Sequence, residues 1–429
     1  MHLDLKNEEL AINGGTPVRT KPWMDNFTVG NEEKQAVLRV LDSGYLSLFE
    51  GSHVPDPPFS FYGGTEVQSL EKMWCDYYKC GYAVAVNSAT SGLYAAVGAL
   101  ELGYGDEVIV SPYTMSACAM APMIYGAIPV FADVELDTGS LDPKSIEKLI
   151  TKRTKAILVV HQFGIPANMD KIMNIAKEND FRVIEDCAQA HGAKYKDKFV
   201  GTIGDIGVFS LNVNKTIQTG EGGVCVTNSE ELRYRLALIR NHGEAVVGPA
   251  QYAKITNIAG FNYRLTEIQA AIAKEQLKKL DDLNDKRLEM VEYLTNELKE
   301  IDFLSPFQGR KDCKSTYYVY PVRFLPEVAK VSRSEFVKVV NAEGINFYQG
   351  YTKPLYLQPV YQNKHLFKNG YPFSATENKE CFMHYSSGTC PNAERLYFNE
   401  MLINEHVRFP HSINDVYDIA EAIKKCIAK

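Results

Sequence analysis

Short apolar segments alternate with helix-length segments between residues 107 and 227, and this alternation constrains the fold more than any other feature. The apolar segments cover residues 107–111, 128–134, 155–161, 182–186, 206–211 and 224–227. Strands separated by helices are typical of a layered α/β fold with a largely parallel sheet. The run Ala156-Ile-Leu-Val-Val160 is apolar throughout, as a strand covered on both faces requires. We therefore predict an α/β fold.

The rest of the chain divides around this region. Gly and Pro punctuate residues 1–30, and Asn31 is placed to cap the first helix after them. A long, highly charged stretch with regularly spaced leucines predicts a helix that connects two domains. The predicted parts are an N-terminal arm (1–30), a large α/β domain (31–265), the connecting helix (266–300) and a smaller C-terminal α+β domain (301–429).

The composition limits the classes of partner. Hydrophobic residues make up 45% of the 429 residues and charged residues 23%, which is ordinary for a globular protein. The net charge of −7 gives no electrostatic reason to expect nucleic acid. Nine cysteines without a C-x-x-C pair fit reduced thiols, and no stretch approaches the ~18 consecutive apolar residues of a membrane span. We expect a cytoplasmic protein that binds small molecules, not nucleic acid or a membrane.

Lys215 follows a predicted buried strand and precedes the glycine-rich run Thr219-Gly-Glu-Gly-Gly223. Glycines permit positive φ and a close approach of the backbone to a ligand. A lysine amine at such a turn can form an imine with a bound aldehyde. A single lysine beside a glycine-rich turn is more often a solvated surface residue, so this interpretation depends on the residues that accompany it.

An acidic pair, Glu185-Asp186, ends the strand predicted over 182–186. Ligands of open α/β sheets bind at the carboxyl ends of the strands. A partly buried aspartate there can keep the ring nitrogen of pyridoxal phosphate (PLP) protonated, which makes that cofactor an electron sink. Asp186 is the candidate for this contact, and Gln189 is placed to reach a ring oxygen. Alternatively, the acidic pair caps a following helix.

Small and hydroxyl residues open a predicted helix in the segment Val86-Asn-Ser-Ala-Thr-Ser-Gly92. The free amides of a helix N-terminus bind anions, and hydroxyl groups add further donors. Ser88, Ala89 and Thr90 are therefore candidates for a phosphate site, with Ser210 as an additional donor. The same residue types also serve as plain helix caps.

Taken together, the motifs along nearly the whole chain resemble the DegT/DnrJ/EryC1/StrS aminotransferases, fold-type-I PLP enzymes that aminate keto-sugars and keto-cyclitols. The motifs that carry the resemblance are Leu10-Ala-Ile-Asn-Gly-Gly-Thr-Pro-Val-Arg19, Gly105-Asp-Glu-Val-Ile-Val110, Gly126-Ala-Ile-Pro-Val-Phe-Ala-Asp-Val134, Glu185-Asp-Cys-Ala-Gln189, Gly201-Thr-Ile-Gly-Asp-Ile-Gly207, Thr219-Gly-Glu-Gly-Gly223, Gly260-Phe-Asn-Tyr-Arg264 and Cys390-Pro-Asn-Ala-Glu-Arg395. The resemblance implies a mostly parallel seven-stranded sheet between helices in the large domain.

The resemblance also implies roles for the residues that contact the cofactor. Lys215 looks like the lysine that forms the internal aldimine and moves the proton. Asp186 looks like the partner of the pyridine nitrogen, and Gln189 the contact to the ring hydroxyl. Ala89, Thr90 and Ser210 look like phosphate ligands.

Three further residues lie in matching motifs. Asn262 is similar to the asparagine with which family members reach the phosphate bound by the neighbouring subunit. The resemblance therefore implies a homodimer with active sites at the interface. His161 and Arg264 are expected near the same site, as residues that contact the substrate.

Two positions depart from the family pattern. The resemblance places an aromatic residue over the cofactor ring, but Met115 stands at that position. Either Met115 packs on the ring through its polarizable sulfur, or Tyr113 takes the place of the aromatic residue. Asn212 stands three residues before Lys215, at a position where relatives often carry His or Gln. We expect this difference to change contacts with the phosphate or the substrate and to leave the imine chemistry intact.

The reaction implied by the resemblance moves an amino group from Glu or Gln to the ketone of a sugar-like acceptor, with pyridoxamine phosphate formed during the cycle. The acceptor is a keto-sugar, a nucleotide-linked keto-sugar or a keto-cyclitol; a small phosphorylated ketone is the alternative. A PLP-dependent dehydratase or aromatising enzyme is a further alternative, but Lys215 argues against it because dehydrating relatives carry histidine there. The acidic charge argues against a non-catalytic, DNA-binding regulator.

Acceptor specificity is expected to come from the segments 43–62 and 346–362. Their aromatic and basic residues either line a pocket or pack a domain joint: Tyr45, Tyr348, Tyr351, Lys353 and Tyr356. Tyr348 is the candidate that we assign to the substrate. The histidines at 161, 191 and 242 show no ligand spacing with the cysteines, so we predict no metal.

Overall fold

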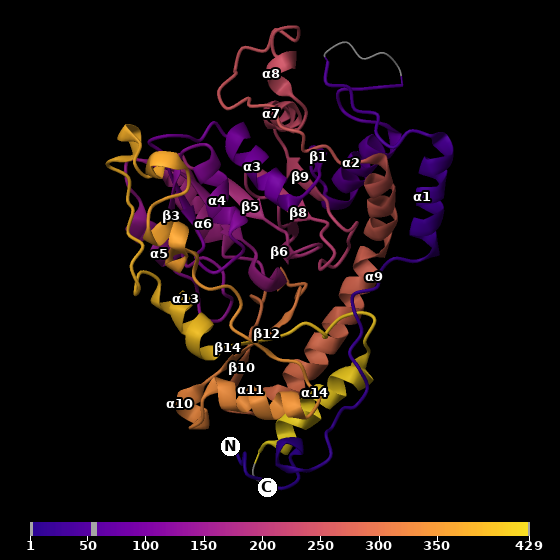
Figure 1. Cartoon of the computed structure of the whole chain (residues 1–429), viewed down its shortest axis with the longest axis vertical. Helices are drawn as coiled ribbons and strands as arrows, with labels where there is room; N and C mark the ends of the chain where they lie inside the picture. Colours follow the sequence, from indigo (N-terminus) through magenta and orange to yellow (C-terminus); the bar gives the residue numbers. More distant parts are fainter. Residues whose placement is uncertain (1–2, 53–57, 428–429) are drawn as a thin grey trace.

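The computed structural model describes residues 3–52 and 58–427 of the chain. Figure 1 shows a large sheet between helices in the upper part of the molecule and a smaller sheet below it. The long helix α9 (Glu267–Leu298) runs along one side and spans both parts. The two ends of the chain lie together at the bottom, where Leu3 forms a β-bridge with Ile427.

The large sheet has seven strands in the order β1-β9-β8-β5-β4-β2-β3. Their bounds are β1 (Tyr82–Val86), β2 (Glu107–Val110), β3 (Ile128–Phe131), β4 (Thr154–Val160), β5 (Arg182–Asp186), β8 (Ile206–Ser210) and β9 (Gly223–Thr227). The five strands from β3 to β8 are parallel to their neighbours, whereas β9 pairs antiparallel with β8 and β1. The predicted α/β fold with a mostly parallel seven-stranded sheet is confirmed.

One strand, β1, was not predicted. Its sequence Tyr-Ala-Val-Ala-Val contains two alanines, which have low strand propensity. It forms because all five residues pair with β9, which lies more than 130 positions later in the sequence. This is a tertiary contact that local propensity cannot indicate.

Helices cover both faces of the sheet because its strands are apolar on both sides. On one face lie α3 (Ala89–Ala99), α4 (Ala117–Ile124) and α7 (Glu230–Arg240). On the other face lie α2 (Thr65–Tyr78), α5 (Pro143–Leu149), α6 (Met169–Asn179) and the first half of α9. Along β2 the side chains alternate, so that Val108 and Val110 pack in the first of these cores and Ile109 in the second.

The first helix, α1 (Asn31–Ser43), begins one residue earlier than predicted. Asn31 is its first residue, and the cap is Gly30, whose amide donates a 2.7 Å hydrogen bond to the Glu33 side chain. Asn31 as the N-cap is therefore wrong. The Glu33 side chain reaches back to satisfy the free amide, so a side-chain oxygen at the cap position is not needed.

The smaller sheet is antiparallel, in the order β10-β12-β14-β13. Its strands are β10 (Leu304–Pro306), β12 (Tyr320–Phe324), β13 (Tyr348–Gln349) and β14 (Met401–Asn404). The helices α11 (Arg333–Ala342) and α14 (Ile413–Lys425) share an apolar core with it and with the second half of α9. The predicted connecting helix thus joins the two cores by contributing side chains to both.

The segment between β13 and β14 returns to the large sheet, as the yellow ribbon beside β3 shows in Figure 1. It carries α12 (Pro359–Gln362) and α13 (Pro391–Arg395). Tyr356, Tyr361 and Tyr385 pack their rings against Phe131 of β3. This part of the C-terminal region therefore extends the core of the large sheet.

The remaining elements are short. A three-stranded sheet consists of β6 (Lys194–Tyr195), β7 (Lys198–Phe199) and β11 (Cys313–Lys314), and two single-turn helices are α8 (Gly243–Val246) and α10 (Pro326–Ala329). None of the helices in the described part of the chain combines the length and apolar character needed to cross a membrane.

Candidate active site

A cavity of about 420 Å³ opens where β5 and β8 end, at Asp186 and Ser210. Its position at the carboxyl edge of the parallel strands is where ligands bind in open α/β sheets. Residues from segments far apart in sequence line it: Ser88, Ala89, Thr90, Leu93, Tyr94, Thr114, Met115, Ser116, Ala117, Met120, Asp186, Ala188, Gln189, Ser210, Asn212, Asn214, Lys215, Glu221, Tyr318 and Tyr351. Every residue predicted to contact the cofactor is in this set except Asn262.

Lys215 extends its amine into this cavity from the loop between β8 and β9. Its Nζ lies 4.4 Å from the ring centre of Tyr318, which comes from the segment before β12. The backbone of the lysine loop is fixed from outside, because the Asn26 side-chain amide donates to the carbonyls of Lys215 (2.9 Å) and Val213 (3.3 Å). Next in sequence, the Thr216 hydroxyl accepts a 2.7 Å hydrogen bond from Arg287 of α9.

Asp186 ends β5 with its carboxylate against the cavity wall and is 5% exposed. One oxygen accepts the Ala188 amide at 2.9 Å, and the other accepts the Cys118 thiol at 3.0 Å. Burial, and then the charge of Asp186, hold the pKa of Cys118 well above its usual range. The thiol therefore keeps its proton and acts as the donor, so that both carboxylate oxygens are held in place.

Gln189 is positioned by hydrogen bonds at both ends of its amide. Its oxygen accepts the Phe163 amide at 2.8 Å, and its nitrogen donates to the Tyr351 hydroxyl at 3.1 Å. The Tyr351 ring packs edge-on against Phe163 and Tyr113. Burial raises the pKa of Tyr351, so the tyrosine stays neutral and can donate its own proton into the cavity.

The phosphate candidates Ser88, Ala89 and Thr90 form the start of α3. The Ser88 hydroxyl caps this helix by accepting the Ser91 amide at 3.1 Å, so the alternative interpretation of this residue as a helix cap is confirmed. The amides of a first helical turn have no partner inside the helix, and here the turn faces the cavity. A Cβ at Gly223 would lie 2.7 Å from the Ala89 nitrogen, so only glycine lets β9 approach this turn.

Tyr113, the alternative candidate for the ring contact, and Tyr348, assigned to the substrate, both lie outside the cavity lining. Tyr113 is fully buried behind Tyr351, and its hydroxyl has no hydrogen-bond partner in the described residues. Tyr348 is 52% exposed at the start of β13. Met115, by contrast, lines the cavity and is 54% exposed, so of the two candidates for the ring contact Met115 is the one at the cavity.

Asn262 and Arg264 lie on a loop outside the cavity lining. Asn262 is exposed and forms an isolated β-bridge with Asn241. Arg264 donates a 3.1 Å hydrogen bond to the Asn241 side chain, which is buried. Arg264 therefore supports the loop that presents Asn262 at the surface.

His161 lies beneath the sheet edge and contacts Glu185 rather than the cavity. Its Nδ1 accepts the Ala167 amide at 3.1 Å, and its Nε2 donates to Glu185 at 2.9 Å. Potential ligand atoms of His161, Glu185 and Cys187 lie within 4.8 Å of one another. Both imidazole nitrogens are already engaged, so we interpret the cluster as structural.

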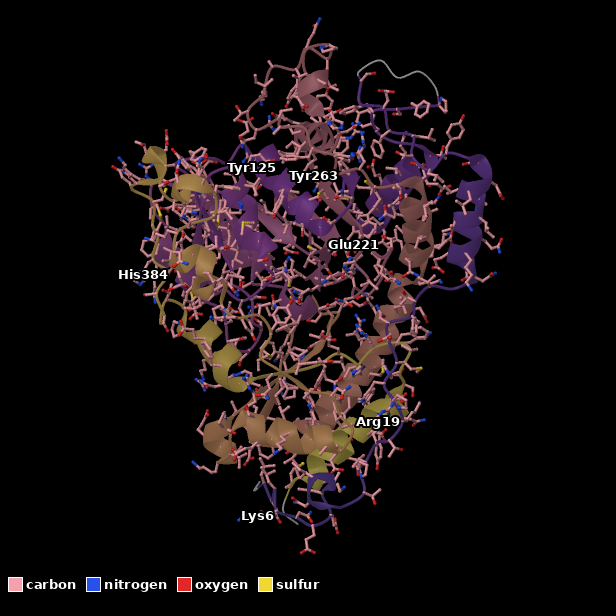
Figure 2. All side chains as sticks on the ribbon, in the orientation of Figure 1. Lys6, Arg19, Tyr125, Glu221, Tyr263 and His384 are labelled. Carbon is pink, nitrogen blue, oxygen red and sulfur yellow. The ribbon has the colours of Figure 1, made fainter. Side chains whose placement is uncertain are left out.

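Several residues of the cavity were not predicted from the sequence. Tyr318 has no motif around it that indicates a ligand. Asn214, Thr114 and Glu221 lie beside or within the sequence motifs but were given no role, and Tyr351 was one of five loop residues left open between a pocket and a domain joint. Figure 2 shows Glu221 near the centre of the molecule, between the two sheets. A position after the carboxyl end of a predicted strand was the available signal for Thr114. Glu221 precedes its strand, and it reaches the same edge only because β9 runs antiparallel to β8.

The residues at the cavity fit PLP on physical grounds. Lys215 offers an amine, Asp186 offers a buried carboxylate with fixed oxygens, and the first turn of α3 offers free amides for a phosphate. Gln189 and Tyr351 add oriented polar groups between them. These are the contacts that an aldehyde, a pyridine nitrogen, a phosphate and a ring hydroxyl require.

Comparison with known proteins agrees with this chemistry. The L-glutamine:2-deoxy-scyllo-inosose aminotransferase of Streptomyces kanamyceticus is 31% identical over 435 residues, which cover 99% of this chain and 98% of that protein. GDP-perosamine synthase of Escherichia coli O157:H7 is 35% identical over 327 residues, covering 76% and 84%. The X-ray structure of the aminotransferase from Psychrobacter cryohalolentis superposes with a TM-score of 0.80 at 29% identity, covering 94% and 98%.

The family assignment follows from a match over most of the chain. Residues 59–395 match the model of the DegT/DnrJ/EryC1/StrS aminotransferase family. This range includes the whole cavity lining described above. The chain belongs to the DegT/DnrJ/EryC1/StrS family of PLP-dependent aminotransferases and is an aminotransferase of fold type I.

Proposed function

We propose that this enzyme binds PLP at Lys215 and transfers an amino group from Glu or Gln to the ketone of a sugar-like acceptor. The observation that carries the proposal is that the Lys215 amine and the Asp186 carboxylate line one cavity, together with the free amides of α3. The names of two relatives given above, which refer to a deoxy-scyllo-inosose and to GDP-perosamine, support a cyclic polyhydroxylated acceptor.

PLP, when bound, supplies an aldehyde for the lysine and a protonated ring that withdraws electrons from the substrate Cα. Asp186 accepts the ring N–H and stabilises its positive charge. The thiol of Cys118 and the amide of Ala188 keep the carboxylate oxygens oriented for this contact. Gln189 and Tyr351 donate toward the ring oxygen, and the amides of Ala89 and Thr90 bind the phosphate, with Ser88, Ser210 and Asn212 beside them.

Lys215 then acts as the acid and base of the reaction. Lys215 would hold the cofactor aldehyde, and its amine, when free, would act as the base that takes the proton from the donor Cα and as the acid that returns it. The amide of Asn26 holds the lysine backbone during these steps. The second half of the cycle, with the ketone as acceptor, uses the same lysine in reverse.

The lining of the cavity is suited to a ring with several hydroxyl groups. Tyr94, Tyr318 and Tyr351 offer flat apolar faces, and Asn214 offers hydrogen bonds. A mixed aromatic and amide lining of this kind binds sugars through ring packing and directed polar contacts. We propose a keto-sugar, a nucleotide-linked keto-sugar or a keto-cyclitol as the acceptor.

The active unit is proposed to be a homodimer, with Asn262 of one subunit reaching the phosphate site of the other. The exposed position of Asn262 outside the cavity of its own subunit supports this arrangement. Replacing Asn262 with Ala should weaken PLP binding without changing the cavity of the subunit that carries the substitution. In mixed dimers with a Lys215→Ala subunit, complementation of activity would support a shared site; strict additivity would contradict it.

The proposed function is tested most directly at Lys215. We expect Lys215→Ala to remove the visible absorbance of the lysine-bound cofactor and to abolish amino transfer, because no other amine lines the cavity in the described residues. Lys198→Ala, which alters an exposed lysine of β7, is the matched control. Borohydride reduction followed by peptide mass mapping should place the cofactor on Lys215. A Lys215→Ala enzyme with full transaminase activity would contradict the assignment.

A further inference from the structure

Two cysteines, Cys75 and Cys80, flank the turn that ends α2. The turn is left-handed at Lys79, whose φ is 56°. The amides of Lys79 and Cys80 both donate to the carbonyl of Cys75, the second over 3.3 Å. Turns of this kind at a helix end commonly bring the side chains at these two positions into contact. The backbone therefore holds the two thiols close together.

This backbone hydrogen bond limits the distance between the two α-carbons. An amide nitrogen lies about 1.5 Å from its own Cα, and a carbonyl oxygen lies about 2.4 Å from the Cα of its residue. Together with the 3.3 Å hydrogen bond, these lengths place the α-carbons of Cys75 and Cys80 at most about 7 Å apart. The path bends at the turn, which shortens the separation toward the range of about 4.4–6.8 Å that disulfides span. The main chain is thus compatible with a disulfide between the two residues.

The two sulfur atoms differ in how readily they ionise. Hydrogen bonding from the Cys80 thiol lowers the pKa of Cys75, although burial and the carboxylates of Glu71 and Asp76 oppose that shift. The same hydrogen bond, together with burial, raises the pKa of Cys80, and the Cys80 thiol also donates to the Tyr82 carbonyl at 3.7 Å. Cys75 therefore ionises first, with the protonated thiol of Cys80 beside it.

The other cysteines of the described residues differ from this pair. Six of them are buried: Cys118, Cys187, Cys225, Cys381, Cys390 and Cys426. Cys313 is half-buried like Cys75 and Cys80, but burial raises its pKa, and its partner across the strand pair is Tyr195. A thiolate within reach of small molecules is the nucleophile of disulfide exchange. Among the described cysteines, Cys75 alone combines partial exposure with a lowered pKa.

We propose that Cys75 and Cys80 are a covalent modification site that closes to an intramolecular disulfide by exchange with a small disulfide such as oxidised glutathione. The Cys75 thiolate attacks one sulfur of the small disulfide, forms a mixed disulfide and releases one small thiol. The Cys80 thiol then gives up its proton and attacks the Cys75 sulfur, and the second small thiol leaves. Two electrons pass from the protein dithiol to the small disulfide, and one S–S bond replaces two protein S–H bonds. An excess of reduced glutathione reverses both steps.

The pair lies where α2 leads into β1 (Figure 1), and neither cysteine lines the cavity. Trp74 and Tyr78 of α2 pack against the ring of Phe209 in β8, with 5.6 and 4.4 Å between ring centres. The disulfide therefore joins two residues of a segment whose position is already fixed by packing. We expect the oxidised holoenzyme to keep its transaminase activity within about twofold. The inference goes beyond the proposed function and can be tested whether or not amino transfer is observed.

The modification is tested on the wild-type holoenzyme in glutathione buffers of increasing oxidised fraction, followed by acid quenching, alkylation and peptide mass mapping. We expect a cross-link between the peptides of Cys75 and Cys80, with the loss of two hydrogen atoms, before any reaction at Cys313. Cys80→Ser should stop at a mixed disulfide on Cys75, because the second attack is no longer possible. Cys75→Ser should slow glutathione addition at Cys80 at least about 10-fold, because that thiol stays protonated. Cys313→Ser is the matched control and should cross-link like the wild type.

The cross-link should form more readily in the folded protein than in the unfolded chain. We expect its equilibrium constant with glutathione to be at least about 10-fold larger in buffer than in urea, and the Tm of the oxidised holoenzyme to be no lower than that of the reduced one. Three results would overturn the proposal: no cross-link at any oxidised fraction, a first reaction at Cys313, or a lower Tm after oxidation. The third result would show that the turn must distort to accept the bond.

Discussion

Glu185 and Asp186 are neighbours in β5, yet their carboxylates face opposite sides of the sheet. Glu185 is fully buried and accepts four hydrogen bonds, from His161 and from the amides of Gly201, Ile203 and Gly204. Asp186 accepts two hydrogen bonds and lines the cavity. The Glu185 carboxylate fixes the backbone of the loop 201–204. The Asp186 carboxylate has fewer partners and can still accept a hydrogen bond from a ligand in the cavity.

The difference follows from the alternation of side chains along a strand. Val183 packs in the core beneath the sheet, and Ile184 packs in the core beneath α3 and α4. Glu185 therefore shares the side of Val183, where the loop 201–204 supplies amides. Asp186 shares the side of Ile184 and reaches the cavity. Because adjacent side chains in a strand face opposite sides of the sheet, two neighbouring acids can have different roles, one structural and one functional.

The largest effects are expected when each carboxylate is made neutral. Asp186→Asn should lower kcat by about 10² to 10³, the range for loss of one electrostatic contact that stabilises charge in the transition state, and leave the fold intact. Glu185→Gln should lower the unfolding free energy by about 3–5 kcal/mol, because its amide would face the amides of Gly201 or Gly204. Single-turnover kinetics and urea denaturation measure the two effects. If Glu185→Gln were the inactive and stable variant, the two roles would be exchanged.

A smaller effect is expected from pH. Burial opposes ionisation of Glu185, but the hydrogen bond from His161 and the backbone amides outweigh it and lower its pKa below 4.5. A lowered pKa stabilises the folded state above pH 4.5, and this contribution is lost as the pH falls below that value, at up to about 1.4 kcal/mol per pH unit. Urea denaturation between pH 6 and pH 3 should show a smaller acid loss in Glu185→Gln. If the unfolding free energy falls equally with pH in the wild type and in Glu185→Gln, Glu185 is not the group responsible for the loss of stability in acid.

The smallest effect concerns the position of Lys215 on the cavity side. Asn26→Ala removes the two hydrogen bonds to the lysine loop and should lower kcat by a few-fold, with an unchanged KM for the acceptor. Asn13→Ala is a close control, because Asn13 also donates to two backbone carbonyls, those of Leu5 and Asn7, in the same arm. The rate of borohydride trapping at Lys215 should fall only in Asn26→Ala. If Asn26→Ala and Asn13→Ala lower kcat and the trapping rate equally, the cause is a general disturbance of the N-terminal arm and not the loss of the contact with the Lys215 backbone.

Local sequence motifs were sufficient to identify most of the residues that we propose for the cofactor. Lys215, Asp186 and Gln189 lie in local motifs, and strand ends place such motifs at the same edge of a parallel sheet. Tyr318 and Cys118 could not be found in this way. Tyr318 reaches Lys215 from the second half of the chain, and Cys118 becomes a hydrogen-bond donor to Asp186 only when α4 packs against β5.

The sequence by itself determined the alternation of strands and helices, the family motifs and the chemistry of Lys215, because these depend on residue type and on spacing within short segments. The tertiary structure decided which of two adjacent acids faces the ligand and which histidine is structural. It also brought Tyr318 to the Lys215 amine. Those decisions depend on contacts between different elements, such as Cys118 with Asp186, 68 positions apart, and Gly201 with Glu185, 16 positions apart. Their energies are set by burial and by the number of partners each charge finds.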